Sequence, residues 1–144
     1  MSRTVPNSPS TVIPSHRYRN APAAIDWLCA TFGFERHAVY ANPDGTIAHA
    51  ELTLGGGMIM LGSGKEDEYG HGFKTPAELG GVETRSTYIV VADADAAHAR
   101  AVAAGGKIIR PLQNTDYGSR EFSVKDPEGY SWSVGTYDPW AANG

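Results

Sequence analysis

Short apolar runs separated by glycine-rich turns fill the chain from residue 12 to residue 136. Two stretches repeat their apolar residues at helical spacing, 21–32 after a capping Asn20 and 94–104 after a capping Asp93. The other runs are shorter and rich in β-branched or alternating apolar residues, which predicts strands. The expected strands are 12–18, 34–40, 47–54, 58–61, 86–91, 108–112, 118–124 and 130–136.

The order strand, helix, strand, strand, strand occurs twice along the chain. Gly33 and Gly106 follow the two helices, and Met60 and Ser133 lie further along the two copies at the same offset in residue number. In between, 51–54 matches 121–124 at a slightly smaller offset, and loops of unequal length take up the difference. The sequence therefore predicts an α+β fold of two βαβββ modules, which bury their open sheet faces by pairing.

We expect one domain at residues 12–144, preceded by a disordered tail at 1–11. The expected divisions of this domain are module one at 12–63, a connector at 64–85, module two at 86–136 and a C-terminal tail at 137–144. In the connector, Thr75, Pro76 and Glu78 have the residue types of a helix cap, a first-turn proline and a capping acid. They predict one short helical turn.

The composition excludes several classes of protein. The chain has 144 residues, 41% of them hydrophobic, and a formal charge of −4 with no basic block, so nucleic acid is not an expected partner. No apolar stretch reaches the length of a membrane span, and the first residues do not resemble an export signal, so we expect a cytoplasmic protein. The single cysteine, Cys29, cannot form an internal disulfide and is expected to be an inert, buried thiol.

Three blocks of sequence carry a family resemblance: RYRNAPAAIDWLCATFGFE, HAELTLGGGMIMLGS and YGSREFSVKDPEGYSWSVGTYDPW. With the paired modules, they resemble the vicinal oxygen chelate superfamily, which includes glyoxalase I, bleomycin-resistance proteins and extradiol dioxygenases. The resemblance covers residues 12–140, and its most specific piece is the turn at Asp126–Tyr130. It implies a curved, U-shaped mixed sheet around a cleft, and a homodimer. Asp126 and Pro127 are turn residues and indicate the fold rather than chemistry.

The resemblance also implies where a metal would be held. Catalytic members use His and Glu side chains on the first and fourth strand of each module, and the matching positions here are Ile13, Met60, Ser86 and Ser133. Isoleucine has no ligand atom, a thioether suits such divalent ions poorly, and neutral serines do not restore the missing charge. We therefore expect no metal and no cofactor, as in the metal-free, bleomycin-resistance-type branch.

Alternation along the strands separates pocket-facing from core residues. The predicted ligand-binding residues are Ile13, Ser15, Arg17, Met58, Met60, Ser86, Tyr88, Ser131 and Ser133, with Tyr117 and Arg120 at the cavity mouth. The opposite parity gives an apolar core set of Ile59, Leu61, Ile89, Val91, Trp132 and Val134. Hydroxyls, thioethers and one cation suit a planar or amphiphilic organic ligand. The alternative is a cleft filled by its own side chains.

Other polar residues admit two interpretations. Arg17 either holds an acidic ligand group or pairs with a neighbouring acid. His49 and Glu51 lie two apart on one strand face, which permits a metal-binding or acid–base pair, although Glu51 has a counterpart in Glu121 that favours a structural role. His71, in the connector, either closes over a ligand or is a solvated loop residue.

The residues before the last hairpin are similarly open. Tyr117, Arg120 and Glu121 either orient a bound aromatic or cationic ligand or form an ion pair at the rim. His16 and His98 are expected to be packing residues, because His16 has the parity of the core and His98 matches an apolar helix position.

The sequence thus favours metal-independent binding of a small organic molecule, such as an antibiotic-like compound, in the cleft between the modules of a homodimer. One alternative is a glyoxalase-like lyase or isomerase, or a dioxygenase-type enzyme, that uses His49, Glu51 or Tyr88 or metal ligands at unexpected positions. A third hypothesis is a protein with a vestigial cleft that acts through its dimer surface.

Overall fold

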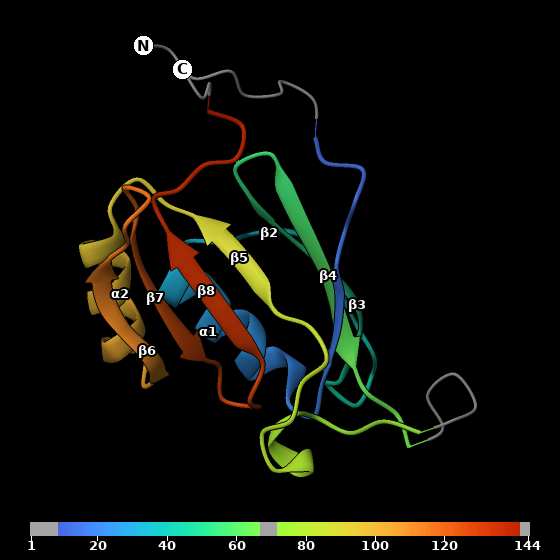
Figure 1. The fold of residues 1–144 in the computed structure, drawn as a ribbon. Helices are drawn as coiled ribbons and strands as arrows, with labels where there is room; N and C mark the ends of the chain where they lie inside the picture. Colours follow the sequence, from blue (N-terminus) through green and yellow to red (C-terminus); the bar gives the residue numbers. More distant parts are fainter. Residues whose placement is uncertain (1–8, 67–71, 142–144) are drawn as a thin grey trace.

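The computed structural model describes residues 9–66 and 72–141 and contains the two predicted βαβββ modules (Figure 1). Module one holds β1 (Ser15–Tyr18), α1 (Ala21–Phe32), β2 (Glu35–Ala41), β3 (Ile47–Leu54) and β4 (Gly57–Ser63). Module two holds β5 (Thr87–Val90), α2 (Ala94–Ala103), β6 (Lys107–Asn114), β7 (Arg120–Lys125) and β8 (Ser131–Gly135). The short helix η2 (Ala77–Leu79) lies in the connector, as predicted. The α+β, two-module fold is confirmed.

Each module forms its own mixed, four-stranded sheet, and the strand pairing defines these as two separate sheets. The strand orders are β1-β4-β3-β2 and β5-β8-β7-β6, so equivalent strands occupy equivalent places. The first and last strands of each module pair in parallel, Ser15 with Met60 and Tyr88 with Ser133. Tyr88 follows Ser15, and Ser133 follows Met60, by the same number of residues. This equal spacing confirms the duplication.

The register corrects one part of the predicted repeat. Glu51 lies opposite Met60, whereas the residue opposite Ser133 is Ser123. Glu51 therefore corresponds to Ser123, and the predicted match of Glu51 with Glu121 is wrong. The cause is local: between paired residues, the β7–β8 hairpin is one residue longer than the β3–β4 hairpin, and not three residues longer as the predicted match required.

A repeated bulge supports the corrected alignment. Pairing shifts between Arg36 and Ala38 in β2, and again between Ile108 and Arg110 in β6. These interruptions are separated by the same offset as Glu51 and Ser123. A bulge bends its strand and strengthens the local twist, so both modules curve in the same way.

The helices begin at the predicted caps. The Asn20 side chain accepts from the Ala23 N–H at 3.2 Å, and that of Asp93 accepts from the Ala96 N–H at 3.0 Å. Helix α1 ends at Gly33, whose φ of 84° lies in the left-handed region that glycine tolerates best. No helix in the described ranges has the length and apolar character needed to span a bilayer.

Strands β1 and β5 are shorter than expected. β1 begins at Ser15 because Pro14 cannot donate to the ladder, although its carbonyl accepts from the Met60 N–H at 2.9 Å. Ile13 therefore precedes β1. Ser86 likewise lies just before the first residue of β5. The sheet neighbours of Met60 and Ser133 are Ser15 and Tyr88.

The core lies between the sheets and the helices and joins the two modules. The predicted apolar set is buried at Ile59, Leu61, Ile89, Trp132 and Val134, and half-buried at Val91. Trp132 packs against Phe32 and Phe34 of module one, with ring centroids 5.5 and 6.2 Å apart. The Trp27 indole also donates to the Ala104 carbonyl at 3.0 Å. The modules thus share one core.

A buried polar contact supplements this core. Asp126 accepts hydrogen bonds from the Tyr18 hydroxyl at 2.6 Å and the Trp132 indole at 3.1 Å. It also accepts from the N–H groups of Glu128 and Tyr130 at 3.0 and 3.1 Å, which confirms its role in the turn. Burial raises the pKa of Asp126 despite these donors.

His16 packs beside this contact and makes the fold sensitive to acid. It is 5% exposed and stacks on Trp132 with ring centroids 5.2 Å apart, as expected of a packing residue. Burial, with the charge of Arg85, lowers the pKa of His16 from 6.5 to about 4.

The folded state keeps His16 neutral, whereas in the unfolded chain His16 takes up a proton below about pH 6.5. The neutral, buried His16 therefore does not reduce the free energy of unfolding above pH 6.5 and does so below it. The free energy of unfolding falls by about 3 kcal/mol as the pH drops toward 4, from the shift of the His16 pKa. We expect His16→Phe to flatten this part of the stability profile in urea unfolding at several pH values. The exposed His37→Phe is the control and keeps the wild-type slope; a wild-type slope in His16→Phe contradicts the assignment.

Candidate functional site

A groove of about 1020 Å³ lies between the two modules. It lies where β4 begins and β5 ends, toward the top of Figure 1. Module one contributes residues from the N-terminal segment, Phe34, the β3–β4 turn and the start of β4. Module two contributes β5, Val91, Ala92, Thr136, Asp138 and Trp140.

Hydrogen bonds to main-chain groups hold the irregular segments around this groove. The Ser10 N–H donates to the Gly56 carbonyl at 2.8 Å, which fixes the N-terminal segment against the β3–β4 turn. On the other side, the Tyr88 hydroxyl donates to the Tyr137 carbonyl at 2.7 Å, and the Tyr137 N–H donates to the Ser119 hydroxyl at 3.0 Å. The groove walls are thus attached to both sheets.

The lining is mostly apolar. Among the described residues around the groove, Asp138 is the one charged side chain, and it accepts from the Trp140 N–H at 2.8 Å. Met58 and Tyr88 present apolar surface to the groove, the buried Phe34 touches it, and the exposed Trp140 stands at the rim. Such a lining suits an apolar ligand with few polar atoms.

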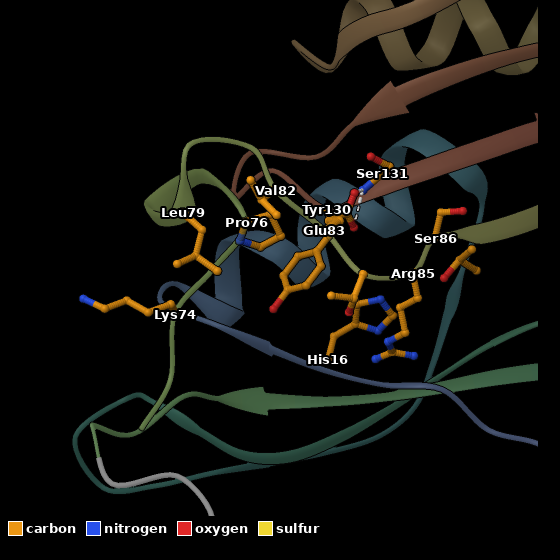
Figure 2. Close-up of a pocket in the computed structure, with 12 residues that line it drawn as sticks. His16, Lys74, Pro76, Leu79, Val82, Glu83, Arg85, Ser86, Tyr130 and Ser131 are labelled. Carbon is orange, nitrogen blue, oxygen red and sulfur yellow. Dashed lines mark hydrogen bonds between the residues drawn. The ribbon is translucent and has the colours of Figure 1, made fainter. Parts of the chain in front are cut away.

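The predicted ligand-binding residues do not all meet in this groove. Met58 and Tyr88 line it, whereas Ser86 and Ser131 line a separate, smaller cavity beside the connector (Figure 2). The predicted residues that line neither hollow are Ile13, Ser15, Arg17, Met60, Ser133, Tyr117 and Arg120. Strand parity identifies a face of each sheet, but the two hollows lie at the ends of the sheets and not over their centres.

A chain of polar groups covers one side of module two. Ser133 contacts the Ser123 hydroxyl at 2.9 Å, and Arg110 donates to that hydroxyl at 3.1 Å and to Glu121 at 3.2 Å. Tyr117 donates to the same carboxylate at 2.8 Å. Burial acts to raise the pKa of Glu121, but hydrogen bonds from Tyr117, Ser119 and Arg110 outweigh it and lower the pKa. The network is mutually satisfied.

Arg120 lies apart from this network. It pairs with Asp95 of α2 at 3.1 Å and donates to Asn114, on the opposite side of β7 from Glu121. The expected group of Tyr117, Arg120 and Glu121 is therefore only partly assembled. The geometry favours the ion-pair interpretation of Arg120, and we leave it out of the proposed site.

His49 and Glu51 do form a pair. Nε2 of His49 lies 2.9 Å from one Glu51 oxygen, and Nε2 of His37, a neighbour that the sequence did not indicate, lies 3.9 Å from the other. Tyr40 stacks on His49 with ring centroids 6.2 Å apart. Neither His49 nor Glu51 lines either hollow.

Two other residues considered in the sequence, Cys29 and His98, are not placed as reactive groups. Cys29 is half-buried, and burial raises the pKa of its thiol, so little reactive thiolate forms near neutral pH. His98 packs edge-on against Phe122 with ring centroids 5.1 Å apart, as expected of a packing residue. His71 lies outside the described residues.

Comparison with known proteins identifies the family. Residues 15–134 match the model of the Glyoxalase/Bleomycin resistance protein/Dioxygenase superfamily. The chain belongs to this superfamily. An uncharacterised protein of Mycobacterium tuberculosis, Rv0887c, is 33% identical over 116 residues, which are 81% of this chain and 68% of that protein.

Solved structures of the superfamily share the fold. TioX from Micromonospora sp. ML1 is 30% identical, with a TM-score of 0.67 over 88% of this chain and 97% of TioX. The fosfomycin resistance protein FosX from Mesorhizobium loti is 13% identical, with a TM-score of 0.66 over 90% and 93% of the two chains. Glyoxalase I from Zea mays is 19% identical, with a TM-score of 0.64 over 85% of this chain and 43% of the maize chain. The superfamily thus includes resistance proteins and enzymes.

The residues at the positions implied for the family's metal do not fit a divalent ion. Across the first sheet, Met60 lies between Ser15 and Glu51, and across the second, Ser133 lies between Tyr88 and Ser123. Glu51 is the one carboxylate among these neighbours, and it is hydrogen-bonded to His49. Within residues 9–66 and 72–141, no three His, Cys, Asp or Glu residues are arranged to hold a metal. Met60, Ser133 and their sheet neighbours thus supply one carboxylate and no imidazole, which is too few ligands for these ions.

Proposed function

We propose that this protein binds a small organic molecule in the groove between its modules, without a metal ion. The observation that carries the proposal is the groove itself, whose volume of about 1020 Å³ is enough for a drug-sized ligand. The poor fit of Met60 and Ser133 to metal ligation supports the metal-independent part. Equilibrium binding, with no chemical step, is the proposed mechanism.

The lining also indicates the chemical class of this ligand. Met58, Tyr88 and Trp140 supply apolar and aromatic surface, and no described Lys, Arg or His lines the groove. Polyanions such as phosphate esters have no cation to pair with in this described lining. We therefore infer a neutral or cationic, largely apolar ligand, and antibiotic-like compounds are the first to screen, given the family.

We also propose that the protein is a homodimer. Ser15, Met60 and Ser133 line neither hollow of the single chain, and the apolar side chain of Val90 remains exposed in the groove wall. A second copy that covers these residues buries them together. Sedimentation at several concentrations tests this, and a monomer throughout contradicts it.

The groove is tested with Nile red, a neutral planar dye that fluoresces in apolar surroundings. We expect saturable binding at one site per chain, weakened about 5- to 30-fold by Tyr88→Ala, since loss of one aromatic contact removes about 1–2 kcal/mol. Tyr88 also holds the segment that carries Trp140, through its hydrogen bond to Tyr137. Fluorescence titration gives both affinities.

Tyr40→Ala is the matched control, because Tyr40 is another exposed strand tyrosine and lies outside the groove. It should leave Nile red affinity unchanged. Binding that Tyr88→Ala and Tyr40→Ala affect equally, or a titration without saturation, contradicts the groove as the site.

A further inference from the structure

A second hollow lies at the other end of β5, between the connector and the strands β1 and β8 (Figure 2). Its volume is about 200 Å³, and Thr87 is the one described residue that it shares with the groove. An apolar cavity of about 150 Å³ admits benzene, so this cavity is large enough for a small substituted aromatic ring.

The connector wall of this cavity is firmly attached. Both carboxylate oxygens of Glu83 accept from the Ser131 N–H, at 3.0 and 3.1 Å, and the Lys125 ammonium donates to the Gly81 carbonyl at 3.2 Å. A reciprocal capping box closes the turn before η2, with Thr75 and Glu78 bonded to each other's main chain at 2.9 and 3.3 Å. The cavity is therefore preformed, which reduces the entropic cost of binding.

A buried imidazole on the opposite side lacks a partner. His16 is 5% exposed and lines the cavity, and its Nδ1 makes no hydrogen bond with any described residue. Figure 2 shows its ring between Tyr130 and Arg85. A buried polar atom left in this state costs about 1–3 kcal/mol, which makes this side of the cavity a place where the chain accepts a penalty.

The remaining lining divides into a charged part and an apolar part. Arg85 and Lys74 bring positive charge. Glu83 is the one acidic residue among the described lining residues, and its carboxylate accepts hydrogen bonds from the Ser131 N–H. Arg85 is positioned by its hydrogen bond to the Ser15 carbonyl at 2.8 Å. The apolar part consists of Pro76, Leu79 and Val82. An anionic group and an apolar body are both accommodated.

We propose that this cavity is a second binding site, for a small organic carboxylate. Its carboxylate accepts hydrogen bonds from Arg85, next to the His16 ring, and its apolar body packs against Leu79 and Val82. The site differs from the groove in charge, size and position, so it does not depend on the function proposed above.

Benzoate, which matches the cavity in size, is the probe for this site. In NMR titrations of the full chain, followed at the imidazole C–H signals of His16, we expect a saturable shift with benzoate. The neutral analogue benzyl alcohol should bind about tenfold more weakly, because it cannot form the charge-assisted pair with Arg85. Arg85→Gln should remove this preference by weakening benzoate binding alone, whereas Arg36→Gln, at an exposed arginine elsewhere, should not.

Two outcomes overturn the proposal. One is the absence of a saturable His16 shift up to about 20 mM benzoate, a concentration that detects even millimolar affinity. The other is an Arg85→Gln variant that keeps the wild-type preference for benzoate. Tyr88→Ala separates the two sites, because it should weaken Nile red binding in the groove and leave the benzoate shift at His16 unchanged.

Discussion

Replacing Asp126 with alanine lowers the free energy of unfolding by about 3–5 kcal/mol, the largest effect we expect from a single substitution. Asp126 is buried and accepts four hydrogen bonds, two of them from the fully buried side chains of Tyr18 and Trp132. Alanine leaves all four donors without their acceptor and removes a polar link between the modules. Urea unfolding followed by tryptophan fluorescence measures the loss.

Two companion variants test the cause of this loss. Asp126→Asn keeps one acceptor oxygen but adds an amide facing existing donors, so we expect an intermediate loss of about 1–2 kcal/mol. Pro127→Ala changes the exposed neighbour in the same turn and should cost less than about 1 kcal/mol. Equal losses in Asp126→Ala and Pro127→Ala would show that turn geometry, and not the buried hydrogen bonds, governs stability here.

Gly129→Ala should destabilise the fold by about 2–4 kcal/mol, for two separate reasons. Gly129 has a φ of 93°, in the left-handed region that a Cβ disfavours. An added Cβ would also lie 2.7 Å from the Ala77 main-chain nitrogen, which donates to the Glu128 carbonyl at 3.1 Å. The substitution therefore forces η2 away from the β7–β8 turn, and thermal or urea unfolding reports the loss.

Gly118→Ala provides the matched control. Gly118 has a similar φ of 85°, but no described atom lies within 4 Å of its added Cβ. It should therefore show only the backbone cost of about 1–2 kcal/mol. A Gly129→Ala variant no less stable than Gly118→Ala contradicts the close approach of η2 to the turn.

Local signals in the sequence were enough to predict the elements and their order. The α1 helix begins after Asn20 and ends before Gly33 because the cap and the stop are encoded at those two residues. β3 has the predicted bounds, Ile47–Leu54, because a glycine turn follows it and apolar residues alternate along it. The burial of Trp132 followed from strand parity alone.

Strand register and the shape of the site depend on longer-range contacts. The bulges at 36–38 and 108–110 and the unequal hairpin loops decide that Glu51 corresponds to Ser123, and none of them has a distinctive residue pattern. The groove is bordered by two segments outside regular structure, held by contacts such as Ser10 to Gly56 and Tyr137 to Ser119. Parity along a strand identifies a face, but it does not locate where such segments create a hollow.

The proposed function has two parts, binding of a ligand in the groove and independence from a metal ion. One titration tests both parts. Nile red affinity is measured for the protein in excess EDTA and again with excess Mn²⁺, Ni²⁺ or Zn²⁺. The account predicts the same dissociation constant within about twofold under all conditions, because the residues at Met60 and Ser133 do not hold a metal and the groove lining supplies no metal ligand set. A change of about tenfold or more on adding or removing a metal would contradict it.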